Sequence, residues 1–124
     1  ENNRNNKNLK IFPSIEFESF LTLLKHAKLV IGNSSMGIRE APIYGIPSIN
    51  IGDRQFRRSK NVSILNVEMD EKSIHNAITT VLNNGSMIDS TKEFGHGNSA
   101  KEFLFVLESD DFWKTKIQKF FHDR

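Results

Sequence analysis

A turn rich in glycine and serine, Gly32–Gly37, holds the residue types that suit a phosphate ligand. It follows an apolar run typical of a strand and precedes apolar residues at helical spacing, so it predicts a strand-to-helix junction. A helix N-terminus presents unpaired N–H groups and roughly half a unit of positive charge. Gly32 and Gly37 allow close backbone approach, while Ser34 and Ser35 add hydroxyl donors. The turn is therefore either a phosphate site or an ordinary helix cap, because Asn and Ser are also favoured capping residues.

Charged residues beyond the turn could complete such a site. Glu40 lies about one turn into the expected helix, where its carboxylate would repel phosphate but could accept two hydrogen bonds from vicinal hydroxyls, as acidic residues do with ribose. The alternative, commoner for a lone residue, is a solvated acid that complements the helix dipole. Arg54 follows the next expected strand, and its planar donors could reach a diphosphate at the neighbouring junction.

Composition and spacing argue against other kinds of site. The chain has 17 Lys and Arg against 15 Asp and Glu, a balance too weak for a nucleic-acid protein, and we assign Arg57, Arg58 and Lys60 to a solvated loop face. Zero cysteines and four histidines without ligand spacing predict no metal site, and no motif suggests a bound cofactor. No apolar run approaches the roughly 18 residues of a membrane helix, and the first residues lack a signal-peptide core. We expect a cytoplasmic protein that binds neither nucleic acid nor membrane.

Strand-like and helix-like segments alternate along the chain. Strands are expected at residues 9–12, 29–31, 47–51 and 62–67. Helices are expected at residues 16–27, 35–44, 71–84, around 103–107 and at 112–121. This alternation predicts parallel βαβ units with right-handed crossovers, hence a three-layer Rossmann-like α/β domain. Since ligands of such sheets lie at the carboxyl ends of the strands, the Gly32–Gly37 turn and the Gly52–Arg58 loop should lie at one edge.

Several local features refine this prediction. Ser14 and Asp70 are expected to cap their helices, and Gly45 is expected to end the second helix. Pro42 removes a backbone donor and should kink that helix. The apolar strand at residues 29–31 is expected to be buried on both faces.

The length of 124 residues leaves room for one hydrophobic core, so we expect a single domain over residues 1–124. The Asn-rich residues 1–8 are typical of a mobile loop, and this abrupt polar start suggests the latter part of a larger protein. The aromatic residues expected in the core are Phe94, Phe103, Phe105 and Trp113.

The run from Val30 to Pro42, continued over residues 45–55, resembles the UDP-N-acetylglucosamine 2-epimerase family, and most closely its hydrolysing branch in sialic-acid biosynthesis. A second segment resembles the family's Tyr-Gly-Asp-Gly-Asn turn, with Phe94 for Tyr and His96 for Asp. The likeness covers residues 17–107. It implies the second of two facing Rossmann-like domains, the GT-B arrangement, with the substrate in the cleft between them. The chain would then lack the N-terminal domain, which carries the family's catalytic acid and base.

The resemblance also implies a UDP site made by six residues of this chain: Phe20, Ser34, Ser35, Gly37, Glu40 and Arg54. The serine turn would hold the diphosphate, the glutamate would hold the ribose, and the arginine would lie beside the nucleotide. Phe20 matches the residue that lies against uracil, although periodicity alone assigns it to the core.

The activity implied by the resemblance is conversion of UDP-N-acetylglucosamine to N-acetylmannosamine and UDP. No catalytic residue is expected in this chain, which alone should be inactive. Its expected partners are the UDP-sugar, the N-terminal domain of the same protein and, in a homo-oligomer, further copies. Two alternatives stay open: an epimerase for another UDP-sugar such as UDP-diacetylbacillosamine, and a non-catalytic nucleotide-sugar-binding or interaction module on the same fold.

Overall fold

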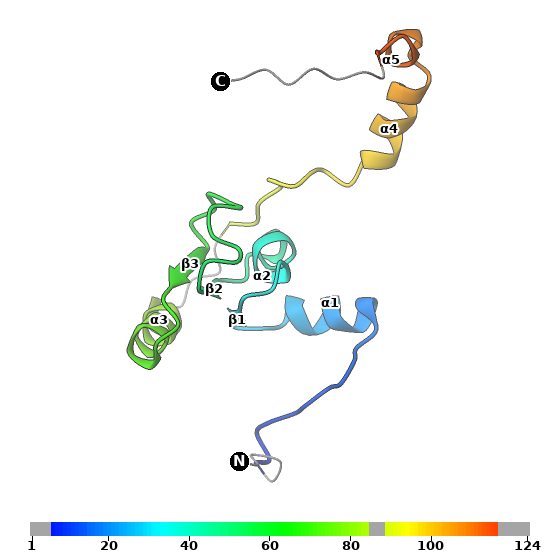
Figure 1. Ribbon diagram of the computed structural model, residues 1–124. Helices are drawn as coiled ribbons and strands as arrows, with labels where there is room; N and C mark the ends of the chain where they lie inside the picture. Colours follow the sequence, from blue (N-terminus) through cyan, green and yellow to red (C-terminus); the bar gives the residue numbers. More distant parts are fainter. Residues whose placement is uncertain (1–5, 85–88, 117–124) are drawn as a thin grey trace, which may run out of the picture. The chain divides into compact units, whose positions relative to one another are not determined.

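The structure is a computed structural model that describes residues 6–84 and 89–116, and the chain divides into two compact units, residues 1–91 and 92–124. The first unit contains a parallel sheet with its helices, and the second contains two short helices (Figure 1). The elements of the first unit are α1 Phe17–Lys25, β1 Val30–Gly32, α2 Met36–Arg39, the 3₁₀ helix η2 Ala41–Tyr44, β2 Ser48–Ile51, β3 Ile64–Val67 and α3 Glu71–Asn84. Those of the second unit are α4 Ser99–Leu107 and α5 Asp110–Trp113.

The three described strands are parallel and lie in the order β1-β2-β3. Ile31 of β1 pairs with Ile49 of β2, and Ile49 pairs with Leu65 of β3. The ends of the three strands are therefore aligned. The central strand β2 is buried along most of its length, and Ile49 has no exposed surface. α2 packs beside β1 and β2, and α3 packs beside β2 and β3 (Figure 1). These elements form a Rossmann-like α/β domain, so the predicted fold class is confirmed.

The core of the first unit forms where α1 and η2 meet. Leu24 of α1, Ala41 of η2 and Ile46 make a buried cluster, with Phe20 and Tyr44 packed at its border. Burial of one leucine side chain contributes about 1.5–3 kcal/mol. The cluster therefore ties α1 to the chain segment that follows α2.

Pro42 divides the helix expected between Ser35 and Gly45 into α2 and η2. The proline lies in the first turn of η2, where a missing N–H leaves no helical carbonyl unpaired. Gly45 ends η2 as expected: its φ of 67° is left-handed, and its N–H donates to the Pro42 carbonyl at 3.1 Å. The predicted kink is confirmed, and it leaves α2 only four residues long.

The cap of α3 is also as predicted. Asp70 Oδ1 accepts the Ser73 N–H at 2.9 Å. Hydrogen bonds from the Ser73 hydroxyl and, second, from the Ser73 backbone amide hold the pKa of Asp70 below its ordinary value. The sequence Asn84-Gly85 predicts the end of this helix, and Gly85 lies outside the described residues.

Three expectations for the first unit are wrong. Residues 9–12 form no strand and are exposed, because their backbone finds no ladder partner; Leu9 N–H instead makes a local turn bond to the Asn6 carbonyl. Ser14 does not cap α1, whose N-cap is Glu16, since the helix begins two residues too late for Ser14 to reach it. β1 is not buried on both faces: Val30 packs against the cluster of α1 and η2, whereas Ile31, which points to the opposite face, is 43% exposed.

The aromatic residues assigned to the core from residue 94 onward are exposed instead, from 46% for Phe94 to 76% for Phe105. α4 contains no buried residue, since two short helices offer too little surface to cover one another. The last expected helix begins with α5, while Ile117, Phe120 and Phe121 lie outside the described residues. Across residues 6–84 and 89–116, every helix is too short or too polar to cross a membrane.

Asp70→Ala should lower the melting temperature by a few degrees at pH 7, because Ser73 loses its acceptor. The native pKa of Asp70 is depressed below the ordinary 3.8, so this stabilisation is present above pH 3.8 and is lost as the pH falls through the native value. Thermal unfolding followed by circular dichroism from pH 7 to pH 2 should show wild type and variant converging in acid.

Asp70→Asn is the matched control, because an amide oxygen can still accept from Ser73. It should lose less stability at pH 7 than the alanine variant, and the difference between the two variants should not change with pH. Equal losses in both variants would show that the cap does not stabilise α3.

Candidate functional site

Two loops meet at the carboxyl ends of β1 and β2. Gly32 ends β1 in register with Asn50 of β2, so the Gly32–Gly37 turn and the Gly52–Arg58 loop leave the sheet at the same edge. A direct hydrogen bond joins them: Gln55 Nε2 donates to the Asn33 carbonyl at 3.3 Å. The expectation that both segments lie at one edge is confirmed.

The serines of the turn are exposed at the start of α2. The Met36 N–H donates to Ser34 Oγ across 3.4 Å, a long contact that a ligand oxygen could replace. Ser35 is the N-cap of α2 and makes no side-chain capping bond. Both hydroxyls therefore face solvent as available donors.

The turn differs from the expected helix start in its electrostatics. α2 has four residues, so its aligned peptide dipoles supply less than the half charge of a long helix. The N–H of Gly37 already donates to the Ser34 carbonyl at 3.2 Å, and that of Ile38 donates to the Ser35 carbonyl at 3.0 Å. The Gly37 and Ile38 N–H groups are therefore not the unpaired donors expected of a helix N-terminus. The binding of a diphosphate at this turn stays a prediction.

Gly37 is buried and lies against the central strand. A Cβ built on Gly37 would overlap Ser48 Oγ of β2. Because Gly37 has no side chain, α2 can approach β2 closely. The sequence instead predicts that this glycine allows the backbone to approach a ligand. A direct contact of Gly37 with substrate stays a prediction.

Glu40 lies at the junction of α2 and η2 and is half-buried. Its Oε2 is shielded from solvent and has no hydrogen-bond partner. An unpaired buried acceptor costs about 1–3 kcal/mol, which a hydroxyl donor would recover. A ligand hydroxyl can reach this oxygen only after the side chain rotates outward, so the ribose assignment stays a prediction.

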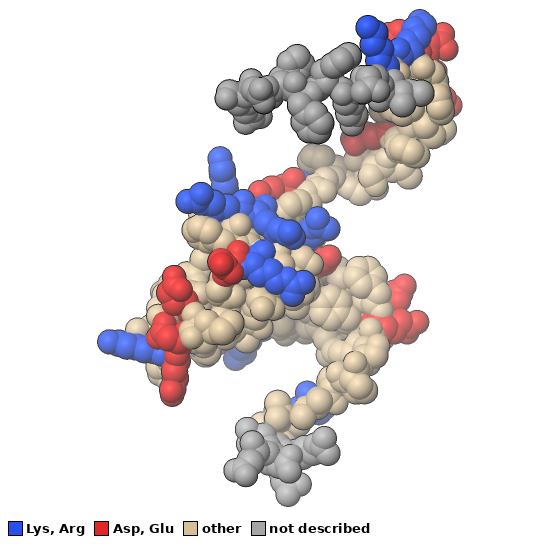
Figure 2. All heavy atoms as spheres, in the orientation of Figure 1, with Lys and Arg blue, Asp and Glu red and all other residues tan. Residues whose placement is uncertain are grey.

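The loop after β2 is positively charged. Arg54 is exposed and follows Gly52, whose φ of 73° turns the chain away from the strand. Arg57 has a left-handed φ of 62°, and its guanidinium lies 5.2 Å from the centre of the Phe56 ring. Arg58 Nη1 donates to Gln55 Oε1 at 3.1 Å. Figure 2 shows Lys and Arg side chains gathered at this end of the first unit, a field that attracts anions.

Phe20 projects from α1 at the border of the apolar cluster. Its ring stacks on Phe17 with centroids 6.4 Å apart and an interplanar angle of 28°. The periodicity that assigned Phe20 to the core is thus partly correct, because its described contacts are with α1 and the cluster. Its contact with uracil stays a prediction.

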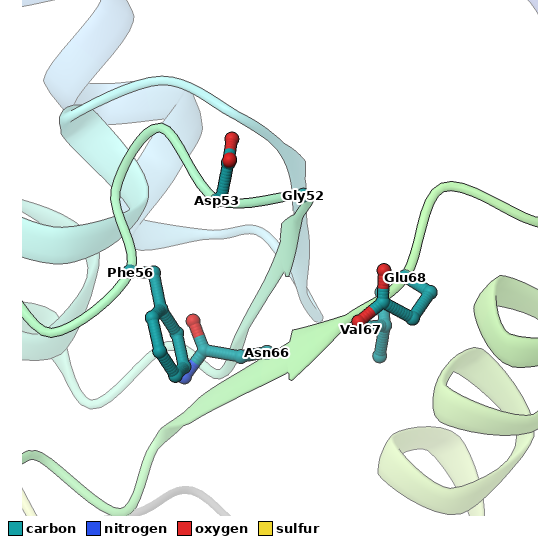
Figure 3. Close-up of a pocket in the computed structure, with 6 residues that line it drawn as sticks. All are labelled: Gly52, Asp53, Phe56, Asn66, Val67 and Glu68. Atoms are coloured by element: carbon teal, nitrogen blue, oxygen red, sulfur yellow. The ribbon is translucent and has the colours of Figure 1, made fainter.

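A cavity of about 240 Å³ lies beside the Gly52–Arg58 loop, at the carboxyl ends of β2 and β3. Figure 3 shows its lining residues: Gly52, Asp53, Phe56, Asn66, Val67 and Glu68. Two of these are carboxylates, which would repel a phosphate. All six predicted site residues lie outside this lining, so the cavity is a neighbour of the predicted site.

Sequence reasoning missed two amides beneath the loops. Asn50 is 1% exposed, and its Nδ2 donates to Asn66 Oδ1 at 2.7 Å. Gln55 is 3% exposed and bridges the two loops. An uncharged amide within a charged loop is the signal that could have drawn attention to Gln55, since a buried amide needs specific partners. In residues 6–84 and 89–116 no cluster of His, Asp and Glu is arranged to hold a metal ion.

Comparison with known proteins gives one family. The family model described as UDP-N-acetylglucosamine 2-epimerase matches residues 1–108. The UDP-N-acetylglucosamine 2-epimerase of Neisseria meningitidis is 44% identical over 115 residues, which cover 90% of this chain and 30% of that protein.

Two further relatives match shorter stretches. The GDP/UDP-N,N'-diacetylbacillosamine 2-epimerase (hydrolyzing) of Campylobacter jejuni is 41% identical over 68 residues, or 55% of this chain and 18% of that protein. The polysialic acid biosynthesis protein P7 of Escherichia coli is 39% identical over 61 residues, or 49% of this chain and 16% of that protein. The chain therefore spans less than a third of the length of these relatives.

Gly37→Ala should destabilise the protein by about 1–3 kcal/mol, since the added methyl group overlaps Ser48 Oγ. Urea unfolding followed by circular dichroism measures this loss. Ser48→Ala removes the hydroxyl, so the double variant should recover at least half of it. Strict additivity of the two single losses would contradict the contact between α2 and β2.

Proposed function

The chain belongs to the UDP-N-acetylglucosamine 2-epimerase family, and we propose that it is the UDP-binding half of a hydrolysing 2-epimerase. The full-length enzyme of this proposal converts UDP-N-acetylglucosamine to N-acetylmannosamine and UDP. The main support is the meeting of two loops at the carboxyl ends of β1 and β2, one with exposed serine hydroxyls and one with exposed arginines. Hydroxyl and guanidinium donors on adjacent strand ends suit a diphosphate.

The proposed contacts follow from what each group can donate or accept. The Ser34 and Ser35 hydroxyls donate to phosphate oxygens, and Arg54 donates through its planar fork. The Glu40 carboxylate accepts from the ribose hydroxyls, which would also supply the partner that its buried Oε2 lacks. Phe20, which is half-buried at the border of the cluster of Leu24, Ala41 and Ile46, lies against uracil.

The proposed role in catalysis is stabilisation of the leaving group. A base removes the proton at C2 of the sugar, and UDP departs from C1, which leaves a double bond between C1 and C2. Water then adds across this bond: its hydroxide goes to C1 and a proton goes to C2, whose configuration is inverted. As the C1–O bond breaks, negative charge develops on UDP, so donors already fixed around its phosphates lower the barrier. The proton-transferring groups belong, in this proposal, to a second Rossmann-like domain that faces this one in a GT-B arrangement.

The choice of sugar has a second candidate. The Campylobacter jejuni relative is named as an epimerase of N,N'-diacetylbacillosamine linked to GDP or UDP, and its name includes hydrolysis. A diacetylated sugar would place the same diphosphate on the same loops, so this chain's residues fit both substrates. The family model and the Neisseria meningitidis relative are both named for UDP-N-acetylglucosamine, which favours N-acetylglucosamine as the first candidate.

Ser34→Ala with Ser35→Ala, and separately Arg54→Ala, should each weaken UDP binding by about tenfold or more, because hydrogen bonds to a charged group contribute about 1.5–3 kcal/mol. Isothermal titration of the full-length protein with UDP measures the effect. Lys72→Ala is the matched control for charge, since Lys72 is an exposed cation on α3. Wild-type protein that is folded and binds no UDP at millimolar concentration would refute the proposal.

The 124-residue chain alone should release no UDP from UDP-N-acetylglucosamine, because a positioned general acid or base typically contributes about 10²–10⁴-fold in rate and none is assigned here. A coupled assay for UDP, run on the chain after circular dichroism has shown it folded and on the full-length enzyme, tests this. Turnover by the chain that Glu40→Ala abolishes would show that catalytic groups lie in this half.

In the full-length enzyme, Arg54→Ala separates two roles of the arginine. A rise in KM with unchanged kcat would mean that Arg54 binds substrate and transition state equally. The proposal expects kcat to fall, because the phosphate charge grows as UDP leaves.

A further inference from the structure

One residue of the exposed loop after β2 is buried. Gln55 is 3% exposed, whereas Asp53, Arg54, Phe56 and Arg57 around it are exposed. Burying a side-chain amide costs free energy unless its donor and acceptor ends find partners. A buried amide in such a loop therefore implies specific contacts at both ends.

Both ends of the Gln55 amide are bonded. Nε2 donates to the Asn33 carbonyl at 3.3 Å, and Oε1 accepts Arg58 Nη1 at 3.1 Å. The Arg58 backbone N–H also donates to the Gln55 carbonyl at 3.3 Å, so Arg58 is tied to Gln55 twice. Gln55 thus connects the turn after β1 to a cation of the loop after β2, across 22 residues of sequence.

The turn that receives this bond has little reinforcement of its own. Gly32 has a φ of 145°, and among the described residues other than Ile31, Gly32 and Asn33 no atom lies within 4 Å of the place where its Cβ would be. Ser35 makes no side-chain capping bond, and the contact between the Met36 N–H and Ser34 Oγ is 3.4 Å long. The hydrogen bond from Gln55 to Asn33 is therefore a main restraint on the positions of the Ser34 and Ser35 hydroxyls.

We propose that Gln55 is a positioning residue, which holds the Ser34–Ser35 turn and the Arg58 guanidinium in place for one diphosphate. This inference rests on the proposed function, because the diphosphate is the ligand assigned to the turn. Gln55 acts through its two neighbours, since both ends of its amide are occupied by Asn33 and Arg58. Donors that are ordered before binding lose less conformational entropy when the ligand arrives.

The test compares a ligand that carries the diphosphate with one that lacks it. Gln55→Glu removes the donor to Asn33 and keeps an acceptor for Arg58. In the full-length protein, isothermal titration should show UDP bound about tenfold more weakly and uridine within about twofold of wild type. A general loss of structure would weaken both ligands, so this selectivity separates positioning from stability.

Asn61→Asp is the matched control. It makes the same change from amide to carboxylate at the opposite end of the sheet, and the aspartate keeps an oxygen to accept the Ser63 N–H, now bonded at 2.8 Å. This variant should bind UDP as wild type does. Equal weakening in both variants would overturn the proposal, because added negative charge alone would then explain the effect.

The remaining outcomes separate this inference from the proposed function. Wild-type protein that binds no UDP would remove both. Wild-type protein that binds UDP, with Gln55→Glu binding it equally well, would overturn the positioning role alone. Parallel loss of UDP and uridine would also overturn it. Gln55→Met keeps the length of the side chain without either polar end and adds no charge, so the same selective loss of UDP is expected of it. A loss seen with Gln55→Glu and not with Gln55→Met would overturn the positioning role, because repulsion by the added carboxylate would then explain it.

Discussion

The close approach of α2 to the central strand, where Gly37 lies against Ser48, is the constraint on which the first unit depends. β2 is buried between two parallel neighbours, and α2 can reach it only because position 37 has no side chain. The turn before α2 is thereby fixed above the carboxyl end of β1. Parallel pairing in register brings the end of β2 beside it, and both loops of the candidate site follow from these two facts.

The sequence predicts the elements of the first unit wherever the signal is local. The cap at Asp70, the stop at Gly45 and the break at Pro42 each act within a few residues, and each is present in the structure. Burial and pairing are not local. Residues 9–12 have the composition of a strand but pair with no strand of the described part of the chain. Phe105 has the character of a core residue but is exposed. A sequence pattern indicates which secondary structure a segment can form. Whether the segment forms that structure depends on the segments that pack against it.

The features of the candidate site also fall into those that the sequence predicts and those that depend on contacts between segments. Residue types at strand ends correctly indicate that the serine turn and the basic loop share one edge, because parallel topology follows from the order of elements. Pro42 indicates that the helix after the turn is interrupted, but nothing in the sequence indicates that the Gly37 and Ile38 N–H groups bond to nearby carbonyls, nor that Glu40 has a shielded oxygen. The hydrogen bond from Gln55 to Asn33 forms only because the Gly52–Arg58 loop folds back over the Gly32–Gly37 turn. The spacing of residues within either segment does not indicate this contact.

The left-handed backbone at Arg57 has a consequence for how this loop changes over evolution. A φ of 62° costs most residues about 1–2 kcal/mol, while glycine adopts it freely and asparagine with little penalty. Among related proteins, position 57 should therefore drift toward glycine or asparagine and avoid valine, isoleucine and threonine, whether or not a ligand is bound nearby. Replacement of Arg57 in a relative would then be explained by the lower conformational energy of the backbone. It would not show whether the positive charge of this loop contributes to binding.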